Sequence, residues 1–166
     1  WWDPFLAQRT LSMHSRGERN TRLATLVLDA ETRGLTVLID DETLSIGAGK
    51  GAATWPLSAL PSVSDVPWET LHEIPVALVT GSNGKTTTVR LLSAMFEQSW
   101  QRAGFNCTDG VFVGGDCVAS GDYSGPNGAR RVLRDSRVQA AVLETARGGI
   151  LRRGLAADRA DVAIVT

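Results

Sequence analysis

Cysteine and long apolar segments are scarce in this 166-residue sequence, and each scarcity excludes a class of protein. The only cysteines, Cys107 and Cys117, are too few for a disulfide framework, which indicates a reducing compartment. They also lack the partner histidine or second cysteine pair that a zinc site requires. The longest apolar run, residues 74–79, is far shorter than the ~20 residues that span a bilayer. With no secretory signal at its start, the sequence predicts a cytoplasmic protein.

An excess of charge of either sign is absent too. Seventeen basic and eighteen acidic residues leave a formal charge of -1. Electrostatics therefore give no reason to expect nucleic acid or an anionic membrane as the main partner. Hydrophobic residues make up 43% and charged residues 21% of the chain. These values are typical of globular proteins, so general disorder is excluded.

Both ends of the sequence look cut. The chain opens on Trp1 rather than methionine, and it closes on an apolar run, residues 161–166. A buried parallel strand has this composition, and such a strand normally continues into a loop with ligand contacts. We therefore expect the chain to be part of a larger protein.

Two segments are predicted, and the boundary lies between residues 67 and 68. The stretch 61–67 combines prolines with small polar residues, which is typical of a linker. Residues 1–67 contain apolar positions at helical spacing around 23–30 and a possible hairpin of strands 35–39 and 43–46. This small α+β segment carries no motif that assigns it a role.

The second segment, residues 68–166, alternates between strands and helices. Strands are predicted at 74–80, 105–107, 138–144 and 161–166, and helices at 85–102, 127–134 and 150–156. A loop region rich in glycine and aspartate is expected between 108 and 127. Such alternation predicts an α/β fold, a three-layer sandwich with a mainly parallel sheet that is incomplete at its C-terminus.

The sharpest motif is a phosphate loop between the strand 74–80 and the helix after it. It consists of Thr80, Gly81, Ser82, Asn83, Gly84, Lys85, Thr86 and Thr87. Its glycines let several backbone N–H groups point at one anion, and the helix N-terminus adds partial positive charge. Lys85 would reach the β- and γ-phosphates, and the Thr86 hydroxyl would reach Mg²⁺. The strict Walker pattern has a glycine where Val79 stands, so a plain turn with a chance lysine is the alternative. Against it, Lys50 is the only other lysine.

Glu144 stands at the carboxyl end of the predicted strand 138–144. In parallel α/β sheets ligands bind beyond this edge, which also carries the phosphate loop. A carboxylate at this position can hold the Mg²⁺ that bridges nucleotide phosphates. The alternative is a solvated or helix-capping glutamate.

The loop 80–87 resembles the nucleotide loop of the Mur ligase superfamily, which also dispenses with the first Walker glycine. Residues 143–155 are similar to the matching segment of cyanophycin synthetases and their Mur-ligase-domain relatives, and 108–113 and 121–126 fit the same group. The segments occur in the family's order, and the resemblance covers roughly 76–166. It implies that residues 68–166 are the central ATP-binding domain of a Mur-type ligase.

The resemblance implies an ATP-dependent amide ligase. A substrate carboxylate attacks the γ-phosphate to give an acyl phosphate and ADP, and the amine of an amino acid then displaces phosphate. Lys85 and Glu144 would be catalytic, Thr86 and Glu144 would hold Mg²⁺, and residues 80–87 would bind ATP. Candidate substrate contacts, for which turn chemistry or a solvated helix face is the alternative, are Thr108, Asp109, Asp122, Ser124 and Arg147. Arg152 and Arg153 are the other arginines of this segment that could grip an acidic substrate.

The implied partners are ATP, a carboxylate-bearing peptide or precursor, an amino acid, and the remainder of the ligase with its C-terminal domain. Without that remainder we expect this chain to bind phosphates weakly and to ligate nothing. Two other functions stay open: another P-loop ATPase or kinase, and a non-catalytic ATP-binding module. ADP formation that depends on an acceptor amino acid would distinguish the ligase from both.

Overall fold

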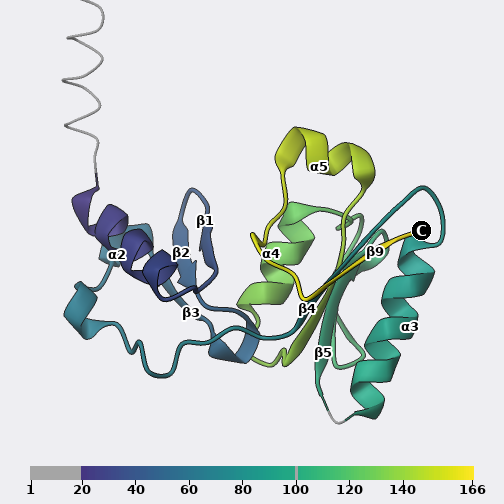
Figure 1. Cartoon of the computed structure of the whole chain (residues 1–166), viewed down its shortest axis with the longest axis horizontal. Coiled ribbons are helices and arrows are strands. Elements are labelled where there is room, and N and C mark those ends of the chain that lie inside the picture. The colour runs from purple at the N-terminus through teal and green to yellow at the C-terminus, as the bar shows by residue number, and fades with distance from the viewer. Residues whose placement is uncertain (1–19, 100) are drawn as a thin grey trace, which may run out of the picture.

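From residue 20 onward, the described N-terminal residues form a small antiparallel sheet with a helix against it (Figure 1). The computed structural model describes residues 20–99 and 101–166. Helix α2 (Thr21–Thr32) packs beside an antiparallel sheet of β1 (Val37–Ile39), β2 (Thr43–Ile46) and β3 (Ala53–Pro56). The helix and the first two strands agree with the predicted pattern, whereas β3 was not predicted.

The stretch 61–67 packs onto this N-terminal sheet. It contains a short 3-10 turn, η3 (Val63–Asp65), and the Trp68 indole donates a hydrogen bond to the Val63 carbonyl at 2.8 Å. Val66 is buried in the same apolar cluster as Leu26 and Leu44. Proline-rich composition alone does not reveal such packing, and the domain boundary between residues 67 and 68 remains a prediction.

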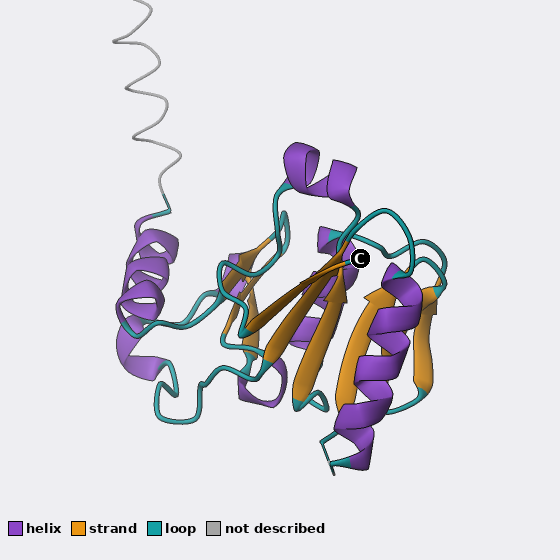
Figure 2. Ribbon diagram, turned by 45° about the vertical axis from the view of Figure 1, so that its right-hand side comes forward, coloured by secondary structure: helices purple, strands orange, loops and turns teal. Residues whose placement is uncertain are grey.

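The larger sheet has six strands in the order β7-β6-β5-β8-β4-β9. Its parallel strands are β4 (Val76–Thr80), β5 (Ala103–Cys107), β8 (Ala140–Glu144) and β9 (Val162–Val165). Helix α3 (Lys85–Gln98) covers one face, α4 (Pro126–Arg134) covers the other, and α5 (Arg147–Arg153) lies beyond the sheet edge (Figures 1 and 2). The predicted three-layer α/β sandwich with a mainly parallel sheet is confirmed. In the described part of the chain, no helix is long and apolar enough to cross a membrane.

Helix α3 ends earlier than its apolar spacing predicts. The sequence extends the helix to residue 102, but the structure ends it at Gln98. Ala103 and Gly104 instead begin β5, paired with Ala140 and Ala141 of β8. The Glu97 carboxylate accepts a hydrogen bond from the Ala103 amide at 2.7 Å, which fixes the reversal. Strand pairing outweighs local helical spacing here. Trp100, which falls in the helix predicted at 85–102, lies outside the described residues.

The region 108–127, predicted as a loop, contains two antiparallel strands. These are β6 (Gly110–Val113) and β7 (Asp116–Ser120), which extend the sheet beyond β5. Gly114 and Gly115 connect them with φ of 57° and 87°, the backbone of a two-residue hairpin turn. The side chains of Val111 and Val113 are completely buried. The prediction of a loop was wrong because a high content of glycine and aspartate also suits a hairpin, whose tight turn is formed here by Gly114 and Gly115. The short helix predicted at 150–156 is also displaced, to Arg147–Arg153.

The two sheets are joined by side chains and by a buried turn. Ala48, next to the 3-10 turn η1 (Gly49–Gly51), lies in the large core cluster, and the Lys50 amide donates to the Val138 carbonyl at 2.8 Å. Gly49 has φ of 53°, and a Cβ there would lie 2.4 Å from the Val138 oxygen. Arg134 of α4 reaches back to form an ion pair with Asp40.

The contact between Arg134 and Asp40 predicts a dependence of stability on pH. The Arg134 guanidinium holds the pKa of the Asp40 carboxyl well below its usual range. A lowered pKa in the folded state means that this stabilisation is present above the pKa of unfolded aspartate, about 4. It is lost as the pH falls through the lower folded-state value. We expect Asp40→Asn to lower the free energy of unfolding by no more than about 1 kcal/mol at pH 7, because the pair is partly exposed.

Urea unfolding at pH 7 and pH 3 checks this expectation. The difference between wild type and Asp40→Asn should shrink at the lower pH. Asp41→Asn is the matched control, since Asp41 is the exposed neighbour in the same turn. An equal pH dependence for both variants would contradict the assignment.

Candidate functional site

The phosphate loop turns from the end of β4 into the start of α3. Gly81 has φ of 138°, and a Cβ on it would lie 2.0 Å from the Thr166 carbonyl oxygen. The Ser82 amide donates to that oxygen at 3.0 Å. Gly84, with φ of 77°, is the residue before the helix. Both glycines therefore hold backbone conformations that side chains disfavour, and the tight turn leaves the first-turn amides of α3 facing outward.

Lys85 lies over this loop. Its ammonium donates to the Gly81 carbonyl at 3.0 Å and lies 3.5 Å from the Ser82 carbonyl. The side chain is half-buried, whereas Ser82 and Asn83 are exposed. A full positive charge is thus held above the loop amides, an arrangement suited to a phosphate group.

The Thr86 hydroxyl and the Glu144 carboxylate meet at the carboxyl ends of β4 and β8. Thr86 donates to Glu144 Oε2 at 2.9 Å, although the two residues are far apart in sequence. The Glu144 side chain is completely buried, and among the described residues its Oε1 has no hydrogen-bond partner. Burial raises the pKa of Glu144, and Asp122 and Asp109 add to this, while the Thr86 hydrogen bond and the Lys85 charge oppose it.

These oxygens fit a hard divalent cation. Mg²⁺ prefers oxygen ligands and is commonly held by one or two carboxylates together with substrate phosphates. A buried carboxylate oxygen with no partner, beside a hydroxyl and a lysine-bearing phosphate loop, matches that pattern. In residues 20–99 and 101–166, no group of three or more His, Cys, Asp or Glu side chains could hold a metal, at this site or elsewhere, so a cation here would need further oxygen ligands such as those of a phosphate.

The tight turn between β5 and β6 brings Thr108 to the same place. Thr108 and Asp109 connect Cys107 to Gly110, its partner in β6. The Thr108 hydroxyl lies 3.4 Å from that of Thr86. Asp109 is turned outward, where it forms an exposed ion pair with Arg90 at 2.7 Å. The structure therefore places Thr108 at the site and Asp109 at its margin.

A second loop, residues 121–125, lies on the α4 side of the sheet edge. The Asp122 carboxylate accepts from the Ser124 amide at 3.0 Å and from the Ser124 hydroxyl at 2.6 Å. These hydrogen bonds lower the pKa of Asp122. Residues 122–128 and Arg153 line a cavity of about 120 Å³. Asp122 and Ser124 thus share a small polar cavity with an arginine.

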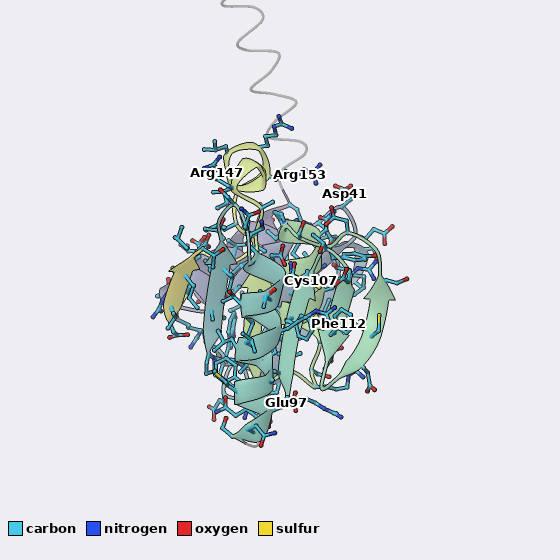
Figure 3. The ribbon with its side chains drawn as sticks, turned by 90° about the vertical axis from the view of Figure 1, so that its right-hand side faces the viewer. Asp41, Glu97, Cys107, Phe112, Arg147 and Arg153 are labelled. Carbon is cyan, nitrogen blue, oxygen red and sulfur yellow. The ribbon has the colours of Figure 1, made fainter. Side chains whose placement is uncertain are left out.

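Helix α5 supplies the arginines of this region. Figure 3 shows Arg147 and Arg153 projecting from α5 beyond the sheet. Arg153 lines the cavity, whereas the exposed Arg147, the candidate chosen from the sequence, does not. Sequence patterns do not decide which of several arginines on a short helix faces the cavity.

Asn106 is a buried residue near the site that sequence reasoning missed. It is completely buried on β5, and its amide nitrogen contacts the main chain of both Glu144 and Tyr123. The available signal was an asparagine directly beside apolar residues in a strand, since a buried polar side chain requires partners.

Comparison with known proteins identifies relatives of this chain. The family model described as Mur ligase middle domain matches residues 79–166, more than half of the chain. A cyanophycin synthetase from Synechocystis sp. is 50% identical over 99 residues, which cover 60% of this chain and 11% of that protein. The cyanophycin synthetase from Trichormus variabilis is 46% identical over 112 residues, covering 66% of this chain and 12% of that protein.

A more distant relative is the UDP-N-acetylmuramoylalanine--D-glutamate ligase from Synechococcus elongatus. It is 49% identical over 39 residues, or 24% of this chain and 8% of that protein. The chain spans about a tenth of the length of the cyanophycin synthetases it matches. All of these relatives carry the name of a ligase or synthetase.

Proposed function

The chain belongs to the Mur ligase middle domain family, and from this premise we propose that it is the nucleotide-binding part of an ATP-dependent amide ligase of the cyanophycin synthetase-like branch. The family and the similar ligases support ligase activity in general. One observation carries the proposal further: the contact between Thr86 and Glu144 at 2.9 Å, with the second carboxylate oxygen left without a partner.

In the proposed reaction an oxygen of the substrate carboxylate attacks the γ-phosphorus of ATP. The bond between the γ-phosphorus and the bridging oxygen breaks, which gives an acyl phosphate and ADP. The nitrogen of an amino acid then attacks the acyl carbon, inorganic phosphate leaves, and the amine gives up a proton as the amide forms. The loop amides and Lys85 would neutralise the charge of the phosphoryl group and hold it in line.

Mg²⁺, when bound, would offset the negative charge of the nucleotide phosphates. Thr86 and Glu144 would hold it, and Thr108 lies close enough to orient a ligand beside them. Thr80, Gly81, Ser82, Asn83, Gly84 and Thr87 would complete the nucleotide site. ATP as co-substrate agrees with the cytoplasmic location that the sequence predicts.

For the carboxyl substrate we propose the cavity between the loop 121–125 and α5. Arg153 offers a cationic group suited to a carboxylate, and Asp122 one suited to an ammonium group. Asp109 and Arg147 would act at the margin. A peptide or precursor with both a carboxylate and an amine fits this combination.

A chimera tests the ligase assignment. Residues 79–166 replace the matching segment of the Synechocystis cyanophycin synthetase, which is 50% identical over 99 residues. We expect the chimera to release ADP only when an acceptor amino acid is present, and the 166-residue chain alone to release none. ADP release without acceptor would favour an ATPase, and nucleotide binding without turnover would favour a non-catalytic module. The same chimera with Lys85→Ala controls for background hydrolysis.

A further inference from the structure

Asn106 joins the two halves of the site through a single nitrogen atom. Its side-chain amide donates to the Glu144 carbonyl at 2.8 Å and to the Tyr123 carbonyl at 2.6 Å. Glu144, the proposed Mg²⁺ ligand, is the last residue of β8. Tyr123 lies between Asp122 and Ser124 in the proposed substrate loop. Among the described residues, no other side chain donates hydrogen bonds to both of these segments.

The chemistry of this contact requires an uncharged amide. Two acceptors on one nitrogen need a donor with two hydrogens, which an asparagine side chain provides. An aspartate would place a buried charge against two carbonyl oxygens, and a leucine would leave both carbonyls without this donor. Space is tight, because a Cβ at Gly128 of α4 would lie 2.8 Å from Asn106 Cβ and 2.2 Å from the Tyr123 oxygen.

The buried side chain of Asn106 also reduces the stability of the fold, and packing gives no reason to keep it. Its Oδ1 is buried without a hydrogen-bond partner in the described part of the protein. A buried acceptor that stays unpaired destabilises the fold, and an apolar side chain of similar shape would avoid this penalty. The residue is therefore best explained by its two donated hydrogen bonds.

We propose that Asn106 is a positioning residue that couples the Mg²⁺–nucleotide site to the loop 121–125, an inference that rests on the proposed function. By holding the main chain of Glu144, it fixes the base from which the carboxylate points at Thr86. By holding Tyr123, it fixes the loop that carries Asp122 and Ser124. Some groups orient a metal ligand by hydrogen bonding to it without touching the metal. Removal of such a group typically lowers metal affinity or activity by about 10- to 100-fold.

The test measures how Mg²⁺ affects nucleotide binding to the whole 166-residue chain. Calorimetry with a non-hydrolysable ATP analogue, with and without Mg²⁺, gives the gain in affinity due to the metal. The NMR signal of the Ser124 backbone amide, which donates a hydrogen bond to the Asp122 carboxylate, reports on the conformation of the loop 121–125. The variants are Asn106→Leu, which removes both donors, and Asn106→Ser, which is smaller and keeps one. Val113→Ala is the control, because it removes buried volume from β6 beside Gly104, away from Glu144.

In the wild type we expect Mg²⁺ to strengthen binding and to shift the Ser124 signal. In Asn106→Leu the gain from Mg²⁺ should fall about 10- to 100-fold and the Ser124 signal should stop responding, with a smaller loss in Asn106→Ser. Val113→Ala should lower the melting temperature yet keep both responses. Asn106 variants that behave like Val113→Ala would overturn the inference alone. A wild-type chain that binds no Mg²⁺–nucleotide would overturn the proposed function, and the inference with it.

Discussion

Replacement of Lys85 by alanine is expected to weaken the binding of Mg²⁺–ATP by about 10- to 100-fold. A hydrogen bond to a charged group contributes about 1.5–3 kcal/mol, and 1.4 kcal/mol corresponds to a factor of ten. The Lys85 ammonium lies over the loop, 3.0 Å from the Gly81 carbonyl, so only a side-chain rotation separates it from a phosphate held by the loop amides. Calorimetric titration of Mg²⁺–ATP into the chain measures the effect.

The sequence supplies its own control for this experiment. Lys50 is the only other lysine, is exposed, and lies in the turn η1 that joins the two sheets. Lys50→Ala removes the same charge from the protein and should leave the dissociation constant within about twofold. Its stability should change by no more than about 0.5 kcal/mol, as is usual for surface substitutions. An equal loss of affinity in both variants would show that net charge, and not a lysine at the loop, governs binding.

The parallel core of the fold could be predicted because its signals are local. The strand β4 is an apolar run, the glycines after it mark a turn, and α3 begins at the lysine. The alternation of strands and helices then gives the three layers. That Thr86 and Glu144 lie together follows from a general rule, since neighbouring parallel strands end at one sheet edge. The structure brings them to 2.9 Å; their roles toward Mg²⁺ stay a prediction.

The antiparallel edge was missed although the sequence carries a signal for it. Val111, Phe112 and Val113 are β-branched or aromatic residues directly before the pair Gly114 and Gly115, which is the pattern of a strand that ends in a two-residue hairpin turn. The number of glycines and aspartates in 108–127 concealed this pattern. Recognising it would also have shown that Thr108, already a candidate, lies in the turn after β5, at the sheet edge that carries the phosphate loop.

Contacts of Asn106 and Arg153 could not be predicted from local pattern. The two carbonyl groups that accept hydrogen bonds from Asn106, at residues 123 and 144, are distant from it in sequence. Where these two carbonyl groups lie depends on how α4 and β8 pack. Arg153 is the last residue of α5, which begins at Arg147, three residues before the position that the sequence indicates. It lines the cavity together with residues 122–128, which are distant from it in sequence.

Glu144→Gln is expected to have opposite effects on binding and on stability. Loss of the carboxylate should reduce the gain in nucleotide affinity that Mg²⁺ provides by at least about tenfold, since removal of even an indirect partner of a metal ligand has an effect of this size. Glutamine keeps the shape of the side chain, and its oxygen can still accept from the Thr86 hydroxyl. A loss that appears only in the presence of Mg²⁺ therefore reports on the metal and not on misfolding.

Without metal the same variant should be more stable than the wild type at neutral pH. Burial raises the pKa of Glu144 in the folded state, so ionisation of this carboxyl disfavours folding. The penalty is absent below the pKa of an unfolded glutamate, about 4.3, and grows as the pH rises through the raised folded-state pKa. Melting temperatures in EDTA should therefore be higher for Glu144→Gln than for wild type at pH 7.5 and nearly equal at pH 4. If Glu144→Gln melts at a lower temperature than wild type at pH 7.5, the carboxylate is a structural partner of Thr86. If it melts at a higher temperature and nucleotide binding no longer depends on Mg²⁺, a destabilising charge is retained at position 144 for the metal.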